Sequence, residues 1–174
     1  MPQNPQVDAV AALICREKRY TLDPSYSAAG AFKRTYRVTS DGSVPLALKI
    51  IVGRVDAARV RREIDALARC NHAHIVRLVE TGVIPHDGQE WVYLVEEFLP
   101  GGTLTTKLAE TGLMPARMAR DFGRDLSSAI EHLAEMQIVH RDIKPDNIMY
   151  RDATTAVLVD LGIARHLDAT ALTA

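Results

Sequence analysis

The densest group of chemically active residues in the chain is the run HRDIKPDN at residues 140–147. It brings together a carboxylate, an amine and an amide at Asp142, Lys144 and Asn147. A further carboxylate, Asp160, follows an apolar run and stands two residues before a glycine. Phosphoryl transfer needs a carboxylate that orients the acceptor hydroxyl, a cation near the moving phosphate and hard oxygen ligands for magnesium. These four residues supply all of those parts.

Two more charges occur where the sequence pattern favours apolar side chains. The strand-like run 45–52 is apolar except at Lys49, and strand alternation places Lys49 on one face with Ala47. Glu63 adjoins the apolar stripe of a helix predicted at 60–67. A buried ion without a partner is costly, so the lysine and the glutamate are predicted to meet. An ordinary structural ion pair, or a lysine that extends its head to water, remains an alternative.

Periodicity divides the chain into a strand-rich block and a helical block. Strands are predicted at 35–39, 45–52, 76–84 and 91–98, after an N-terminal extension with a weak helical pattern at Val7, Val10, Ala11 and Ile14. From Pro100 onward the pattern is helical, and its longest helix carries apolar residues at Met118, Phe122, Leu126, Ile130 and Leu133. A small hairpin is predicted from the segments 148–151 and 156–159. The elements that must position the charged residues are therefore a sheet, one long helix and a short hairpin.

Composition limits the class of protein. The 174 residues are 47% hydrophobic and 25% charged, which is the balance of a soluble globular domain. A net charge of -1 gives no field that would attract nucleic acid or an anionic membrane, so neither is expected as a partner. Two distant cysteines and an N-terminus without signal-peptide features favour a reducing cytoplasm.

The order of these residues closely resembles that of the protein kinase family. The family's HRD-x-K-x-x-N loop, its strand lysine, its helix glutamate and its DFG motif correspond to HRDIKPDN, to Lys49 in LALK, to Glu63 and to the DLG that begins at Asp160. The resemblance implies an α+β, bilobal fold with a small antiparallel-sheet lobe, one helix in that lobe and a partial helical large lobe. It divides the chain into an extension at 1–19, a small lobe and hinge at 20–99 and a partial large lobe at 100–174.

The resemblance also implies a role for individual residues. Asp142 becomes the catalytic aspartate, Lys144 contacts the transferred phosphate, and Lys49 contacts the nucleotide phosphates with Glu63 as its partner. The ligands of Mg²⁺ become Asn147 and Asp160. The residues implied in binding ATP are Gly30, Lys33, Ala47, Lys49, Glu97, Leu99 and Met149, where Ala47 and Met149 sandwich the adenine ring and Glu97 and Leu99 offer backbone groups.

The sequence departs from the family pattern at several positions. Only Gly30 remains of the three glycines in the phosphate-covering loop, and Lys33 either offers its ammonium to a phosphate or points to solvent. DLG replaces DFG. Glu96 stands at the back of the adenine pocket, where an apolar residue is usual, so its carboxylate must either find a partner or narrow the pocket's chemistry.

The resemblance implies a serine/threonine protein kinase whose domain is truncated within the activation segment. A protein substrate is implied, and the remaining lobe, an appended domain or a partner protein is expected to cover the truncated large lobe. The activity of the 174-residue chain itself stays open. The alternative is a catalytically idle, nucleotide-binding scaffold or regulatory module in a larger assembly. A small-molecule phosphotransferase of the same fold is the third hypothesis.

Overall fold

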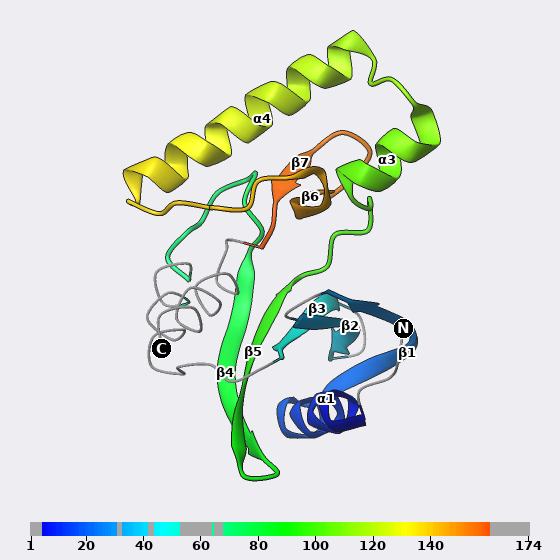
Figure 1. The fold of residues 1–174 in the computed structure, drawn as a ribbon, viewed down its shortest axis with the longest axis vertical. Coiled ribbons are helices and arrows are strands. Elements are labelled where there is room, and N and C mark those ends of the chain that lie inside the picture. The colour runs from blue at the N-terminus through cyan, green and yellow to red at the C-terminus, as the bar shows by residue number, and fades with distance from the viewer. Residues whose placement is uncertain (1–4, 31–32, 42–43, 53–63, 65–67, 161–174) are drawn as a thin grey trace, which may run out of the picture. The chain divides into compact units, whose positions relative to one another are not determined.

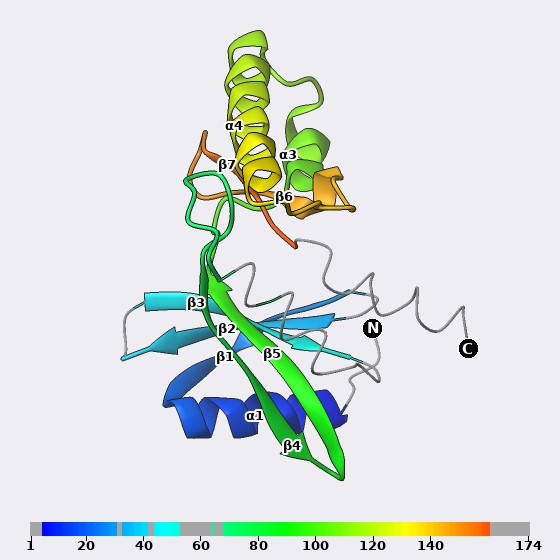
Figure 2. The same ribbon diagram turned by 90° about the vertical axis from the view of Figure 1, so that its left-hand side faces the viewer.

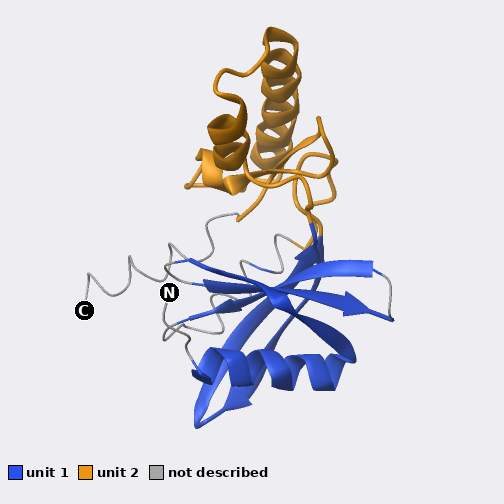
Figure 3. Ribbon diagram, turned by 90° about the vertical axis from the view of Figure 1, so that its right-hand side faces the viewer, with its two compact units in different colours: residues 1–65, 78–98, 164–174 blue, residues 66–77, 99–163 orange. Residues whose placement is uncertain are grey.

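The computed structural model describes residues 5–30, 33–41, 44–52, 64 and 68–160. The chain forms two compact units, drawn in different colours in Figure 3. Unit 1 contains residues 1–65, 78–98 and 164–174, and unit 2 contains residues 66–77 and 99–163. Figure 1 labels the helices and strands of both units.

Unit 1 is built on a five-stranded antiparallel sheet in the order β1-β2-β3-β5-β4. The strands are β1 (Tyr20–Ala29), β2 (Lys33–Ser40), β3 (Val44–Ile51), β4 (Leu78–His86) and β5 (Gln89–Glu97). The last four lie where apolar alternation predicted them. β1 was not predicted, because Pro24 interrupts a mostly exposed run whose pairing register with β2 shifts between Leu22 and Ser27.

The helix α1 (Pro5–Lys18) covers one face of this sheet, as Figure 2 shows. The weak helical pattern of the extension is confirmed, because its apolar residues are the buried ones and form a core with one face of the strands. From β3 that core receives Leu46, Leu48 and Ile50. Alternation therefore places Ala47 and Lys49 on the opposite face of the sheet.

Polar contacts complement this packing of α1. The Tyr36 hydroxyl donates to Oδ1 of Asp8 at 2.6 Å. The pKa of Tyr36 is raised, mainly by burial and secondly by this hydrogen bond. At the other end of the helix, Lys18 pairs with Glu80, which also accepts a hydrogen bond from Tyr20 at 2.9 Å. Both ends of α1 are thus tied to the sheet.

Unit 2 contains α3 (Leu104–Thr111), α4 (Ala116–Glu135), the 3-10 turn η1 (Pro145–Asn147) and a hairpin of β6 (Ile148–Tyr150) and β7 (Ala156–Leu158). The long helix and the small hairpin confirm their predictions. The short helix α3 was not predicted. Its start is marked by Thr103, whose hydroxyl caps the helix by accepting from the amide of Thr106.

One detail of the predicted α4 stripe is wrong. Ile130 is 42% exposed, whereas Ala129 and Leu133 are buried and Phe122 and Leu126 pack against the same core. The apolar stripe consists of Phe122, Leu126, Ala129 and Leu133. Ile130 lies to one side of this stripe because a helix turns 100° per residue.

The helix predicted at 60–67 lies outside the described residues apart from Ile64, which is helical and buried. Glu63, the predicted partner of Lys49, is among the residues left out of the description. Within the described part of the chain, no helix is long and apolar enough to cross a membrane.

Candidate active site

Lys49 is buried on β3, as its place in an apolar strand predicted. Its ammonium Nζ lies 2.6 Å from Oε2 of Glu96 on the neighbouring strand β5. Only 10% of the Lys49 side chain and 9% of the Glu96 side chain are exposed. Of the two outcomes open for the Glu96 carboxylate, the structure shows a partner, Lys49, which comes from the sheet itself.

The register of the sheet explains how these two residues meet. Ala47 is the cross-strand neighbour of Glu96, and Lys49 follows two residues later on the same face. Diagonal neighbours of this kind lie within reach of long side chains. The small side chain of Ala47, which is itself buried, leaves room for the carboxylate to extend toward the lysine.

The predicted phosphate-covering loop is the turn between β1 and β2, of which residues 31–32 are not described. Gly30 donates its amide to the Lys33 carbonyl at 2.9 Å, so this N–H serves the hairpin. A Cβ at Gly30 would meet atoms of Lys33 only at 3.6 Å or more, which is ordinary contact.

Glu97 ends β5, paired with Leu46 of β3. The roles of these residues toward ATP stay predictions.

In unit 2 the residues of the HRDIKPDN run are held by short hydrogen bonds. The Asn147 side-chain nitrogen donates to the Asp142 carbonyl at 2.8 Å and to its Oδ2 at 2.9 Å. Nζ of Lys144 lies 3.0 Å from the same Oδ2. Three residues that the sequence predicted for catalysis and metal binding are therefore in direct contact.

His140 supports this loop from inside. It is 4% exposed, its Nε2 lies 3.0 Å from the Val159 carbonyl, and its Nδ1 accepts the amide of Asp142 at 3.3 Å. The neutral tautomer with its proton on Nε2 satisfies both contacts. Burial lowers the pKa of His140, which favours this neutral form. The ring therefore joins the loop to the end of β7 without adding a charge.

A backbone hydrogen bond links the chain just before Asp160 to Asn147 of the same loop. The amide of Val159 donates to the Asn147 carbonyl at 3.0 Å, so the residue before Asp160 is bonded to the residue predicted as its fellow ligand. Asp160 and Arg141 both have positive φ angles, 61° and 64°. Residues other than glycine rarely adopt this left-handed conformation, and it clusters at functional sites.

The two residues predicted to line the adenine site from unit 2 also come together. Leu99 is buried in a small apolar cluster with Val76, Val157 and Val159, and Met149 packs half-buried against this cluster. Ala47, the other predicted adenine contact, belongs to unit 1.

Burial of polar side chains marks these positions independently of any motif. In the described part of the chain the buried polar or charged residues are Lys49, Glu96, Asp125, His140 and Asn147. Four of them are the residues discussed above. Sequence reasoning missed Asp125, although it carries the same signal as Glu63, a charge beside the apolar stripe of a helix.

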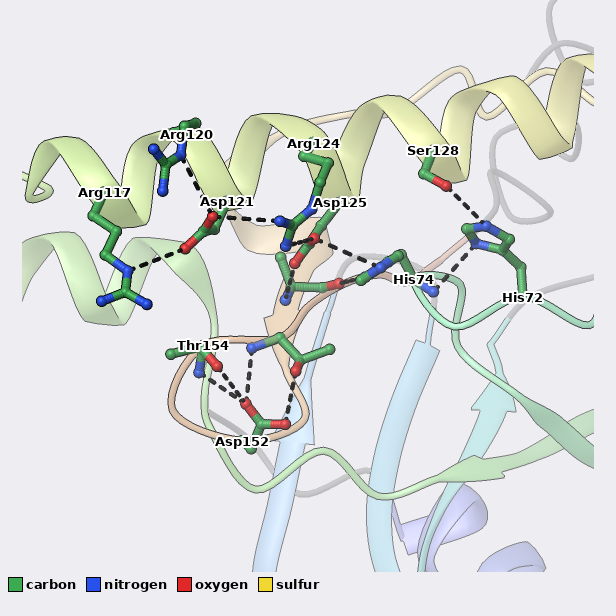
Figure 4. Close-up of polar contacts among 12 residues, drawn as sticks. His72, His74, Arg117, Arg120, Asp121, Arg124, Asp125, Ser128, Asp152 and Thr154 are labelled. Carbon is green, nitrogen blue, oxygen red and sulfur yellow. Dashed lines mark hydrogen bonds and ion pairs between the residues drawn. The ribbon is translucent and has the colours of Figure 1, made fainter.

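Figure 4 shows what holds Asp125. Its carboxylate lies 3.1 Å from Arg124 and 3.6 Å from His74, and it accepts the amide of Ala156 at 3.4 Å. His74 in turn contacts the Ala156 carbonyl at 2.9 Å. Asp125 thus fastens α4 to the start of β7. His72 and His74 pack side by side in unit 2, with ring centres 5.7 Å apart. Among the described residues, no group of three or more His, Cys, Asp or Glu could hold a metal ion.

A pocket of about 540 Å³ adjoins this cluster between α4 and the β6–β7 turn. Its lining includes Arg117, Asp121 and Thr155 but none of the predicted active-site residues.

Comparison with known proteins decides the family. The family model described as protein kinase domain matches residues 29–173. The chain belongs to the protein kinase family. The match begins at the end of β1, so α1 lies outside the part that this kinase shares with the family model.

Individual kinases are similar to it over most of its length. Calcium/calmodulin-dependent protein kinase type IV of Mus musculus is 38% identical over 136 residues, which cover 78% of this chain and 28% of the mouse protein. The serine/threonine-protein kinase AtPK2/AtPK19 of Arabidopsis thaliana is 33% identical over 145 residues, covering 80% of this chain and 30% of the plant protein. The chain thus spans less than a third of the length of these two relatives.

A solved structure shares the fold. The crystal structure of Rad53 1-466 in complex with AMP-PNP superposes with a TM-score of 0.74 at 30% identity, covering 85% of this chain and 39% of that chain. The predicted α+β fold of a partial bilobal kinase is confirmed by this similarity and by the five-stranded antiparallel sheet.

Proposed function

We propose that the protein containing this chain is a serine/threonine protein kinase, which transfers the γ-phosphate of ATP to protein hydroxyl groups with Mg²⁺ as its metal. The single observation that carries the proposal is the contact of Asp142 with both Lys144 and Asn147 at 2.9 to 3.0 Å. Similarity to kinases named as serine/threonine-specific supports the class of acceptor.

Each residue has a task in this proposal. The Asp142 carboxylate accepts the proton of the acceptor hydroxyl, whose oxygen bonds to the γ-phosphorus as ADP departs. Lys144 places a positive charge beside the moving phosphate, and Lys49 does the same for the phosphates of the bound nucleotide. Asn147 holds the Asp142 carboxylate in one orientation through its Nδ2.

The donor set suits magnesium. Because the Asn147 nitrogen faces Asp142, its amide oxygen points away from Asp142 as a hard donor, and Asp160 is placed nearby by the bond between Val159 and Asn147. Magnesium is commonly held by one or two protein oxygens together with water and substrate phosphates. Such a site would supply charge neutralisation for the phosphates. It needs no larger cluster of protein ligands.

The test is phosphate transfer by the full-length protein with labelled ATP and Mg²⁺. Asp142→Asn should lower the transfer rate at least about a hundredfold, because the oriented proton acceptor is lost. Asp87→Asn is the matched control, since Asp87 lies exposed in the β4–β5 turn at a positive φ that asparagine tolerates. Equal rates for Asp142→Asn and the unaltered protein would refute the proposal.

A second candidate function is nucleotide binding without catalysis, in a regulatory or scaffolding role. The turn between β1 and β2 favours it, because Gly30 is the single glycine of the predicted phosphate loop and its amide is bonded to Lys33. A protein that binds Mg-ATP yet shows no transfer that depends on Asp142 would fit this function.

The exposed apolar residues of unit 2 support a further covering element. Ile130, Val139 and Ile143 are 42%, 68% and 47% exposed. Exposed apolar residues that gather into one patch commonly mark a contact with neighbouring protein. We infer that the remaining kinase lobe, an appended domain or a partner protein packs on them. Hydrogen exchange should then slow around residues 139–143 in a longer form of the protein.

A further inference from the structure

Glu96 is a buried carboxylate on β5 at the back of the predicted adenine pocket. An apolar residue is usual there, yet Glu96 forms a 2.6 Å ion pair with Lys49, the lysine proposed to contact ATP. The pair joins β5 to β3 on the face of the sheet opposite to α1.

Stability alone is a poor reason for such a pair. Both side chains are about nine-tenths buried, so both charges give up most of their hydration. Replacing a buried ion pair by apolar residues of similar size is often neutral or stabilising. The carboxylate at this position therefore points to a task for the lysine that it holds.

We propose that Glu96 is a positioning residue for Lys49, which fixes the ammonium where it meets the phosphates of the nucleotide. The proposal rests on the proposed function, in which Lys49 contacts ATP. An ammonium carries three donors, so its bond to Glu96 is compatible with simultaneous bonds to phosphate oxygens. Because Glu96 belongs to a strand paired with β3, the position of the ammonium follows from the register of the sheet.

Two other roles for Glu96 make different predictions. A merely structural pair would support the shape of the nucleotide site and would influence every part of the ligand equally. A carboxylate that competes with phosphate for the lysine would weaken ATP binding, so its removal would tighten it. Positioning instead predicts a loss of affinity that is confined to the phosphates and is transmitted through Lys49.

The experiment measures the affinity of the full-length protein for Mg-ATP and for adenosine by titration calorimetry. The variants are Glu96→Gln, Lys49→Met and the two combined. Glu90→Gln is the matched control, because Glu90 is an exposed glutamate on the same strand.

Glu96→Gln should weaken Mg-ATP binding about tenfold, the factor expected for one charge-assisted contact, and change adenosine binding less than about twofold. In the Lys49→Met background the same substitution should change Mg-ATP binding less than about twofold, because the group it positions is gone. Glu90→Gln should bind both ligands like the unaltered protein.

Equal losses for Mg-ATP and adenosine would overturn the proposal, as would an undiminished loss in the Lys49→Met background, an unchanged affinity or tighter Mg-ATP binding. If Glu96→Gln does not fold, Glu96→Asp keeps the charge but shortens the side chain by one methylene. It should produce a smaller loss that is again specific to Mg-ATP, and equal losses for both ligands would overturn the proposal here too.

The outcome is separable from that of the proposed function because binding requires no phosphate transfer. A protein that binds Mg-ATP with the expected dependence on Glu96 but never phosphorylates a substrate refutes the kinase activity and leaves this inference standing. A protein that phosphorylates its substrate while Glu96→Gln binds Mg-ATP normally refutes only the inference. An unaltered protein with no affinity for Mg-ATP overturns the inference.

Discussion

The two lysine–carboxylate pairs of this kinase are held in different ways. Lys49 and Glu96 lie on paired strands, with 10% and 9% of their side chains exposed. Lys144 and Asp142 lie in a loop, with 45% and 19% exposed. The distances are similar, at 2.6 and 3.0 Å, so the surroundings make the difference.

On the sheet, backbone pairing sets where each side chain starts, and the Glu96 carboxylate meets the end of the Lys49 side chain at 2.6 Å. The same burial makes each charge dependent on the other. The loop has no such ladder, and its backbone includes the left-handed Arg141. There the neutral side chains of His140 and Asn147 fix the backbone and orient Asp142, while its carboxylate remains partly open to water. In the sheet the ion pair is held by paired strands, whereas in the loop neutral hydrogen bonds from Asn147 and to His140 support the ion pair of Asp142 with Lys144.

The largest expected effect is loss of stability when the buried pair is broken. Glu96→Leu should lower the free energy of unfolding by about 4 kcal/mol, because it removes the β5 carboxylate from a buried ammonium. Lys144→Met should cost less than about 1 kcal/mol, since its pair is partly exposed. Urea denaturation of the two variants measures both values.

The double replacement Lys49→Met with Glu96→Leu is the control for this prediction. It should recover most of the stability lost in Glu96→Leu, since no buried charge is then left behind. Similar losses for Glu96→Leu and Lys144→Met would show that the two pairs do not differ as described.

The next effect concerns the face of the sheet behind Lys49. Ile14 of α1 is 1% exposed in the core that backs β3. Ile14→Ala should lower the free energy of unfolding by about 3 kcal/mol through lost burial and a cavity. Hydrogen exchange should quicken in β2 and β3, because the sheet loses its support. Leu113→Ala, at a residue that is 92% exposed, should leave both measurements within error.

A smaller loss is expected where neutral groups hold the loop. Asn147→Ala removes both hydrogen bonds to Asp142 and should cost about 2 kcal/mol in the free energy of unfolding. Hydrogen exchange should quicken around residues 140–147 and stay unchanged in β3. Asn71→Ala, at an exposed asparagine of the same unit, is the control. An effect as small as the control would mean that the loop is held by its backbone alone.

The sequence predicted the regular parts of this arrangement well. Alternation located β3 and the inward side of Lys49, and helical spacing located α4. It failed at β1, where Pro24 and exposed polar residues hide the strand, and at α3, which is short and has few buried residues. These two elements owe their structure to neighbours that a local pattern does not contain.

Contacts between distant residues were harder to predict than the residues themselves. A need for a partner at Glu96 follows from its apolar surroundings, but the choice of Lys49 depends on strand order and register. The bond from Asn147 to Asp142 depends on the turn η1, whose form a loop sequence does not specify. Asp125 carries a signal that the sequence does contain, a charge between the apolar residues Phe122 and Ala129 on one side of a helix.

The smallest expected effect is a dependence of protein stability on pH that originates in unit 2. His72 of unit 2 accepts the amide of His74 on its Nδ1 at 3.2 Å and stacks on His132 with ring centres 5.0 Å apart. Burial, followed by repulsion from His132 and His74, lowers the pKa of His72 below its usual 6.5. The unfolded chain therefore binds this proton more readily than the folded one, so stability rises with pH in that range.

The contribution of His72 is fully present above about pH 6.5 and is lost as pH falls through its lowered pKa in the folded protein. Urea denaturation at pH 7.5 and pH 5.5 should show the unaltered protein losing stability at the lower pH. His72→Asn should lose less over the same interval, because asparagine takes up no proton, and hydrogen exchange should place the difference in unit 2 near His74 and Ser128. A loss of the same size in both proteins would mean that protonation of His72 does not cause the loss of stability at low pH. The neutral histidine contacts of unit 2 would then be no more sensitive to acid than the rest of the protein.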